Sequence, residues 1–135
     1  MGRLLAAAIA VAFLAPVVRA EVTIYSYAFS KQYVVRVSNE ALKESPSWKD
    51  DAENPPLSAK KAIKLANDMK DSLVKDGKSF KWILESASLK PARGDRWYWL
   101  LNYEVEFEGA HVGPPQNLRL IVLMDGTVIK PEVRK

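Results

Sequence analysis

The residues that could carry out chemistry are few, and the first is a single histidine in a segment rich in glycine and proline. His111 lies in GAHVGPPQN, residues 109–117. A loop of this composition exposes its side chains, so His111 could act as a general base beside a carboxylate in a small exported hydrolase. A catalytic site also needs a reacting group and a partner that orients the base, and the sequence indicates neither. We therefore expect no catalytic residues and no enzymatic activity, with the hydrolase as the alternative.

A row of carboxylates is the second candidate. Glu104, Glu106 and Glu108 alternate along a β-rich segment, which places them on one face of a strand. Their spacing along that face is about 7 Å, whereas Ca²⁺ takes roughly six to eight oxygen ligands around one point. We expect a solvated face opposite lysines of a neighbouring strand, with no bound metal. The chain has no cysteine and one histidine, which excludes thiolate and multi-histidine metal sites, and we expect no cofactor.

Aromatic and amide side chains point to a site made for contact. Trp48 lies in the polar segment SPSWKDD, where no apolar period accounts for it. It is either an anchor packed on the body of the protein or an exposed contact. Gln116 and Asn117 end the segment that contains His111. The predicted binding residues, which would contact a protein or peptide, are Trp48, His111, Gln116 and Asn117.

One clear helix is among the elements that must position these residues. Ser58 is the predicted N-cap, and Gly77 is the predicted C-terminal cap with positive φ. Between these two caps, lysines and aspartates occupy one face of the helix. The other face is an apolar stripe with spacings of three and four residues, made by Ala59, Ala62, Ile63, Ala66, Met69 and Leu73.

Strands account for most of the remaining chain. Residues 22–37 favour two strands joined near positions 30 and 31, and residues 80–89 form another strand. Residues 97–108, WYWLLNYEVEFE, are the clearest strand, and their alternate positions from Trp97 to Phe107 are expected to face the helix. Asp-Gly between LRLIVLM and TVIKPEV predicts a closing hairpin.

The expected fold class is α+β. One amphipathic helix would pack on an antiparallel sheet of about four strands, giving a two-layer sandwich with a β-rich N-terminal segment. Residues 39–56 are polar, contain prolines and show no clean apolar period, so they are expected to form a long loop.

The first 20 residues have the composition of a secretory signal peptide. Arg3 precedes an apolar run of 12 residues, which is shorter than the roughly 20 needed to span a membrane as a helix. Small residues before position 21 predict cleavage between Ala20 and Glu21. Residues 21–135 would then form a single domain, secreted or periplasmic, without stable membrane insertion.

Charge argues against a nucleic-acid partner. The chain has 20 basic and 16 acidic residues, for a net charge of +4. Two of the basic residues, Arg3 and Arg19, belong to the predicted leader, so the excess on residues 21–135 is +2. Nucleic-acid-binding domains show a stronger and more clustered basic excess.

Three motifs resemble those of PepSY-like and cystatin-like secreted α+β domains. They are the helix LSAKKAIKLANDM, the strand WYWLLNYEVEFEG and the hairpin LRLIVLMDGTVIKP, within residues 57–133. The resemblance implies an exported module that binds or inhibits proteins, often peptidases. The cystatin motif Gln-x-Val-x-Gly has no match, because residues 109–113 lack the glutamine. We expect a non-enzymatic binding module acting through protein or peptide contacts, with a structural subunit of an envelope assembly as another alternative.

Overall fold

Residues 20–135 fold into six strands and two helices. The structure, a computed structural model, describes this range, so the predicted leader lies outside the described residues except for Ala20, where the first strand begins. In chain order the elements are β1 (Ala20–Ala28), β2 (Lys31–Ser38), α1 (Asn39–Glu44), α2 (Ala59–Leu73), β3 (Phe80–Pro91), β4 (Trp97–Phe107), β5 (Asn117–Leu123) and β6 (Glu132–Arg134).

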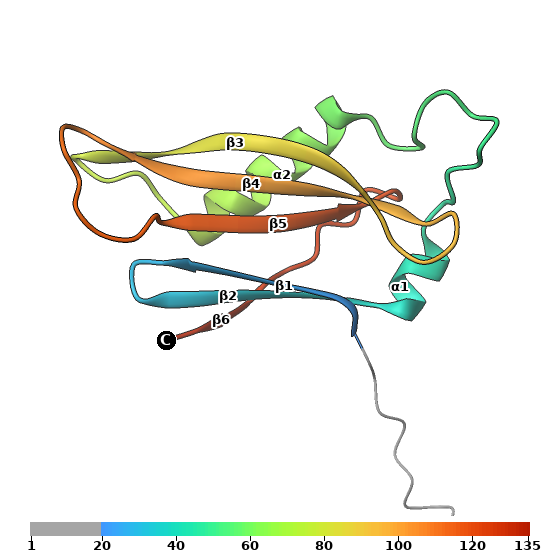
Figure 1. Cartoon of the computed structure of the whole chain (residues 1–135), viewed down its shortest axis with the longest axis horizontal. Helices are drawn as coiled ribbons and strands as arrows, with labels where there is room; N and C mark the ends of the chain where they lie inside the picture. The colour runs from blue at the N-terminus through green and yellow to red at the C-terminus, as the bar shows by residue number, and fades with distance from the viewer. Residues whose placement is uncertain (1–19) are drawn as a thin grey trace, which may run out of the picture.

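The strands form two antiparallel sheets. One has the order β1-β2-β6 and the other β3-β4-β5. Helix α2 packs on one side of β3-β4-β5, and β1-β2-β6 packs on the other side (Figure 1). The prediction of one helix on a single four-stranded sheet is therefore wrong. The fold is a β-sandwich that carries α2 on the outer face of one sheet.

The second layer follows from strand β5, which is buried on both faces. Leu118, Leu120 and Val122 pack in the core beneath α2. Ile121 and Leu123 point the other way and pack against the sheet that contains β2. A strand with one solvated face alternates apolar and polar residues, whereas a nearly continuous apolar run such as LRLIVLM needs a cover on both sides. The single-sheet prediction left one of these faces without a partner.

Strand β4 shows the same division. Trp99, Leu101 and Tyr103 lie beneath α2, as predicted. On the opposite face, Tyr98 and Leu100 pack against the second sheet. This face becomes polar only in the second half of the strand, after Leu100.

Helix α2 begins where the sequence predicts. The hydroxyl of Ser58 accepts a hydrogen bond from the backbone N–H of Lys61, which satisfies one of the free donors at the helix start. Ala62 and Ala66 are fully buried against the sheet, so the small side chains of the stripe allow close approach.

The helix ends earlier than predicted. Its last residue is Leu73 and its C-cap is Val74, so the predicted cap at Gly77 is wrong. The backbone of Gly77 does not have a positive φ. Glycine is favoured there for a different reason, because a Cβ at this position would overlap the ring of Phe80.

Both predicted hairpins are present, but the second is short. The strands β1 and β2 are joined by Phe29 and Ser30. After the Asp-Gly turn, the returning chain makes only an isolated bridge between Val122 and Val128. Pro131 has no N–H for the ladder, and β6 then pairs with β2 in the other sheet. The segment TVIKPEV is therefore divided between the two sheets.

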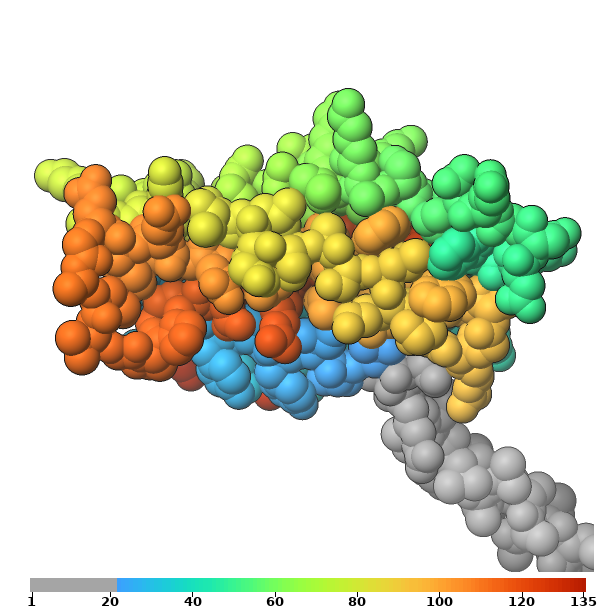
Figure 2. Space-filling model, turned by 45° about the horizontal axis from the view of Figure 1, so that its top comes forward, coloured from blue at the N-terminus to red at the C-terminus, as the bar shows by residue number. Residues whose placement is uncertain are grey.

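Residues 39–56, expected as a long loop, begin with the short helix α1. Its Leu42 is buried in the core between the sheets. The remainder, residues 45–56, lies at one end of the molecule, and the connection between β4 and β5 forms the other end, as Figure 2 shows in teal and orange.

Candidate functional site

The tip of the β1–β2 hairpin has an unusual backbone. Phe29 and Ser30 both have positive φ, 48° and 67°. Two-residue turns of this kind are usually made by Asn and Gly, because the left-handed conformation costs other residues about 1–2 kcal/mol each. A bulky aromatic residue in this position is held there by its surroundings. Such strain is concentrated at functional sites.

Two side-chain amides hold the tip in place. Oδ1 of Asn117 accepts a hydrogen bond from the backbone N–H of Tyr27 at 3.2 Å, and Oε1 of Gln116 accepts one from the N–H of Phe29 at 2.6 Å. Nε2 of Gln116 also donates to the carbonyl of Pro114 at 3.1 Å. The hairpin tip is thus tied to the segment that leads into β5.

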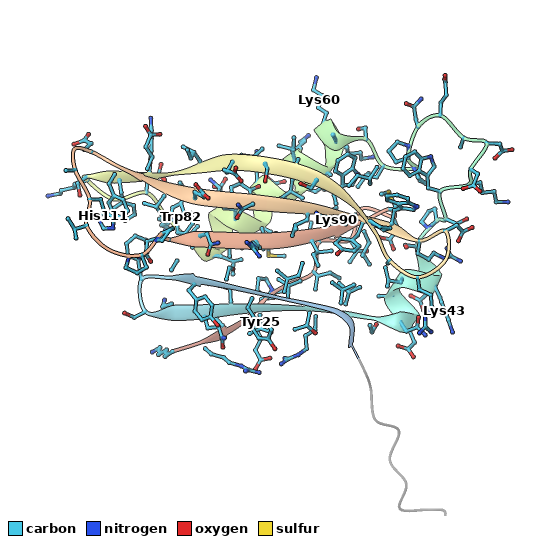
Figure 3. All side chains as sticks on the ribbon, viewed as in Figure 1. Tyr25, Lys43, Lys60, Trp82, Lys90 and His111 are labelled. Atoms are coloured by element: carbon cyan, nitrogen blue, oxygen red, sulfur yellow. The ribbon has the colours of Figure 1, made fainter. Side chains whose placement is uncertain are left out.

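Phe29 belongs to a cluster of rings, which we call the aromatic end: Phe29, Phe80, Trp82, Phe107 and His111. The ring centroid of Phe29 lies 4.9 Å from that of Phe80, 6.2 Å from that of Trp82 and 6.5 Å from that of Phe107. These separations are in the range where aromatic pairs attract. The ring of His111 stacks on Phe107, with centroids 3.7 Å apart and planes 7° apart. Figure 3 shows Trp82 and His111 at this end of the molecule.

The aromatic end is open to solvent although its rings contact one another. The side chain of Phe29 is 45% exposed, and that of Val112 in the adjoining connection is 96% exposed. A groove of about 190 Å³ lies between the hairpin tip and the end of α2, and it includes the buried side chains of Tyr33 and Trp82. A larger groove of about 490 Å³ lies between residues 76–81 and 106–109.

The two grooves differ in charge. The smaller one is lined by Lys31 and Lys75 and by no carboxylate. The larger one has three carboxylates and two lysines. Neither Lys31 nor Lys75 forms an ion pair with another residue in the described part of the chain. Burial raises the pKa of the Tyr33 hydroxyl in the smaller groove above its usual value.

Three of the four predicted binding residues come together here. His111, Gln116 and Asn117 all belong to the aromatic end or its hydrogen bonds. Trp48 lies at the opposite end of the molecule, where its ring is 5.1 Å from that of Trp97.

Trp48 acts in the structure as an anchor for the irregular segment 45–56. Its Nε1 donates a hydrogen bond to the carbonyl of Ala52 at 2.9 Å, and its backbone N–H donates to the carbonyl of Asp95 at 3.0 Å. The sequence left open whether Trp48 is an anchor or an exposed contact, and these bonds favour the anchor.

The surroundings of His111 provide a stacking surface. Its ring lies against Phe107, and among residues 20–135 no hydrogen bond joins it to a carboxylate or hydroxyl. General-base catalysis needs a partner that orients the imidazole. The geometry therefore offers no observation in favour of the hydrolase alternative.

The carboxylates of β4 lie along the polar part of its face. Glu106 is opposite Lys81 of β3, which is the cross-strand arrangement expected from the sequence, whereas Glu104 is opposite Ile83. Glu108 follows the strand, and its N–H donates to the carbonyl of Ser79 at 2.8 Å. Across the described range, no group of three His, Cys, Asp or Glu side chains is placed to hold a metal ion.

Sequence reasoning missed Phe29 and Phe80. The available indication was the position of Phe29 between two β-rich runs, where a hairpin turn normally has small or polar residues. A large apolar side chain at such a position has a packing or binding role. No local pattern indicates Phe80, because its partner Phe29 is distant in the chain.

Among residues 20–135, no helix has the length and apolar character needed to cross a membrane.

The resemblance to PepSY-like and cystatin-like domains gains no support from known proteins. No family model, curated protein or solved structure gives a significant match to this chain.

Proposed function

We propose that this protein is an exported, non-enzymatic binding module that contacts a protein or peptide through its aromatic end. The observation that carries the proposal is Phe29. Its ring is placed by a strained hairpin tip and contacts three other rings, and the residue as a whole is still 45% exposed.

The physical argument is pre-organisation. Binding energy at interfaces is concentrated in a few aromatic anchors, and an anchor that is already ordered loses little conformational entropy on binding. The hydrogen bonds from Tyr27 and Phe29 to the amides of Asn117 and Gln116 hold the tip before any partner arrives. Val112, which directly follows His111 of the aromatic end in the chain, adds an exposed apolar side chain.

Export is part of the proposal and rests on the leader. Residues 1–20 have the charge and apolar run of a signal peptide, and cleavage between Ala20 and Glu21 would release a chain that starts at the second residue of strand β1. The partner would then be met in the periplasm or outside the cell.

Photocrosslinking in the source organism tests the proposed function. A photoreactive phenylalanine analogue is placed at position 29 or 112, and at position 25 as the control. Tyr25 is a good control because it is 46% exposed, almost the same as Phe29, but lies on the outer face of the β1-β2-β6 sheet. Figure 3 shows its label on the side away from β3-β4-β5.

The expected result is one discrete product from positions 29 and 112, absent from position 25, containing the same protein by mass spectrometry. Purified partner should then bind the exported protein without other components. A crosslink of equal yield from position 25, or none from position 29, would contradict the proposal.

A further inference from the structure

We propose that the smaller groove, between the hairpin tip and the end of α2, recognises a peptide segment in which an apolar side chain lies next to acidic residues. This inference rests on the proposed function and specifies the chemistry of the partner at the same site.

The groove has the size and lining for one apolar side chain. Its volume is about 190 Å³, below the roughly 300–1,000 Å³ of pockets that enclose a whole small molecule. Phe29 and Phe80 form its aromatic walls, and Tyr33 and Trp82 lie below with 4% and 6% of their surface exposed. A phenylalanine, leucine or methionine side chain of a partner would be surrounded by rings on several sides.

The charges at the groove favour an anion beside that apolar group. Lys31 begins β2 directly after the strained tip, and Lys75 follows the end of α2, so the two lysines of the lining come from different elements. Both are exposed, and neither has an ion-pair partner within residues 20–135. A carboxylate of a partner could pair with either lysine. Complementary charge of this kind selects among partners and speeds association.

The acidic residue nearest in sequence is already engaged. Asp76 directly follows Lys75, but its Oδ1 accepts a hydrogen bond from the backbone N–H of Trp82 at 2.7 Å. Asp76 lines the larger groove and not the smaller one. The positive character of the smaller groove is therefore not neutralised by its own lining.

The lining also places the two features of the partner close together. The same groove is lined by the aromatic side chains and by both lysines. An extended peptide that places one side chain among the rings would bring its adjacent residues to the lysines, about 3.3–3.4 Å further along for each residue.

A displayed library of random heptapeptides is the probe for this inference. The exported protein is used as bait in three forms: the natural chain, Lys31→Gln with Lys75→Gln, and the control Lys60→Gln with Lys64→Gln. The control removes the same charge from exposed positions of α2 that do not line the groove.

The expected peptides have an aromatic or aliphatic residue next to Asp or Glu. A synthetic peptide of the consensus should bind the natural chain and the control equally, and bind Lys31→Gln with Lys75→Gln about tenfold more weakly at low salt. The matching peptide with Asn and Gln in place of Asp and Glu should show no difference among the three forms. Phe29→Ala should abolish binding of both peptides.

Two results would overturn the inference, and they separate it from the proposed function. If the selected peptides are apolar, lack acidic residues and still need Phe29 for binding, the charge preference is wrong but the proposed binding surface stands. Absence of any Phe29-dependent peptide would remove the groove as a peptide site, and crosslinking at position 29 would then decide the proposed function alone. Self-association lost in Phe29→Ala would show that a second copy occupies the groove, which also contradicts the inference.

Discussion

Phe29 and Gln116 are 87 positions apart in the chain, yet the backbone N–H of Phe29 donates a 2.6 Å hydrogen bond to Oε1 of Gln116. This bond joins the tip of one sheet to the segment that enters the last strand of the other. It holds a residue whose left-handed backbone is unfavourable on its own. The two sheets therefore cooperate to place the aromatic ring that the proposed function depends on.

Removing that bond should loosen the tip. Gln116→Ala is expected to lower the free energy of unfolding by about 1 kcal/mol, because the N–H of Phe29 loses its acceptor. Gln116→Glu keeps an acceptor oxygen and should lose less than half as much. Urea unfolding monitored by tryptophan fluorescence measures both. Equal losses from the two variants would show that the hydrogen bond does not matter.

Relieving the backbone strain should stabilise the protein. Ser30→Gly is expected to raise the free energy of unfolding by about 1 kcal/mol, since glycine adopts the φ of 67° without a Cβ clash. Ser79→Gly is the matched control, because Ser79 is exposed and has no positive φ, so this change should be slightly destabilising. A loss of stability in Ser30→Gly would mean that the turn is not strained.

The two-sided burial of β5 can be tested with neighbouring residues. Leu120→Ala and Ile121→Ala should each cost about 2–4 kcal/mol, because they open cavities in the two separate cores. Arg119→Ala, at an exposed position of the same strand, should change stability by less than roughly 0.5 kcal/mol. If Ile121→Ala also changed stability by less than roughly 0.5 kcal/mol, that face of β5 would be solvated and the second sheet would not cover it.

The short strand β6 should show an acid-dependent contact. Hydrogen bonding and charge from Arg134 lower the pKa of Glu132 below its usual value, and Arg36 adds to the effect. A carboxylate with a lowered pKa in the folded state stabilises that state above its ordinary pKa, and the contribution is lost as pH falls through the lowered value. Glu132 and both arginines are exposed, so the effect of these contacts on overall stability is small.

Titration by NMR measures this contact directly. The midpoint of Glu132 should move up toward its ordinary value in Arg134→Gln, and by a smaller amount in Arg36→Gln. A larger shift from Arg36→Gln would reverse the assigned order of the two partners.

The elements with strong local patterns could be predicted from the sequence. The apolar stripe after Ser58 predicted α2 and its start, and the strict alternation in WYWLLNYEVEFE predicted which face of β4 lies beneath it. The Asp-Gly turn predicted the second hairpin, and two β-rich runs predicted the first. These features depend on residues close together in the chain, where periodicity and capping act.

The second sheet and the site depend on distant contacts. The nearly continuous apolar run LRLIVLM is typical of a strand buried on both faces. The single-sheet prediction covered only one of them, because the second is covered by β2, from the other end of the chain. Phe29 is held by a ring contact with Phe80 and a hydrogen bond to Gln116, and no local sequence pattern predicts either contact. For Trp48 the sequence left an anchor and an exposed contact equally open, and its backbone and side-chain hydrogen bonds favour the anchor.

The most direct measurement is the affinity of the purified crosslinking partner for the exported protein and two of its variants. Phe29→Ala should weaken binding by about tenfold or more, roughly 1.4 kcal/mol, while Tyr25→Ala should stay within about twofold of the natural chain. Both variants must first be shown to be folded, by circular dichroism and urea unfolding. Unchanged affinity in folded Phe29→Ala, or an equal loss in Tyr25→Ala, would contradict the assignment of the aromatic end as the binding surface.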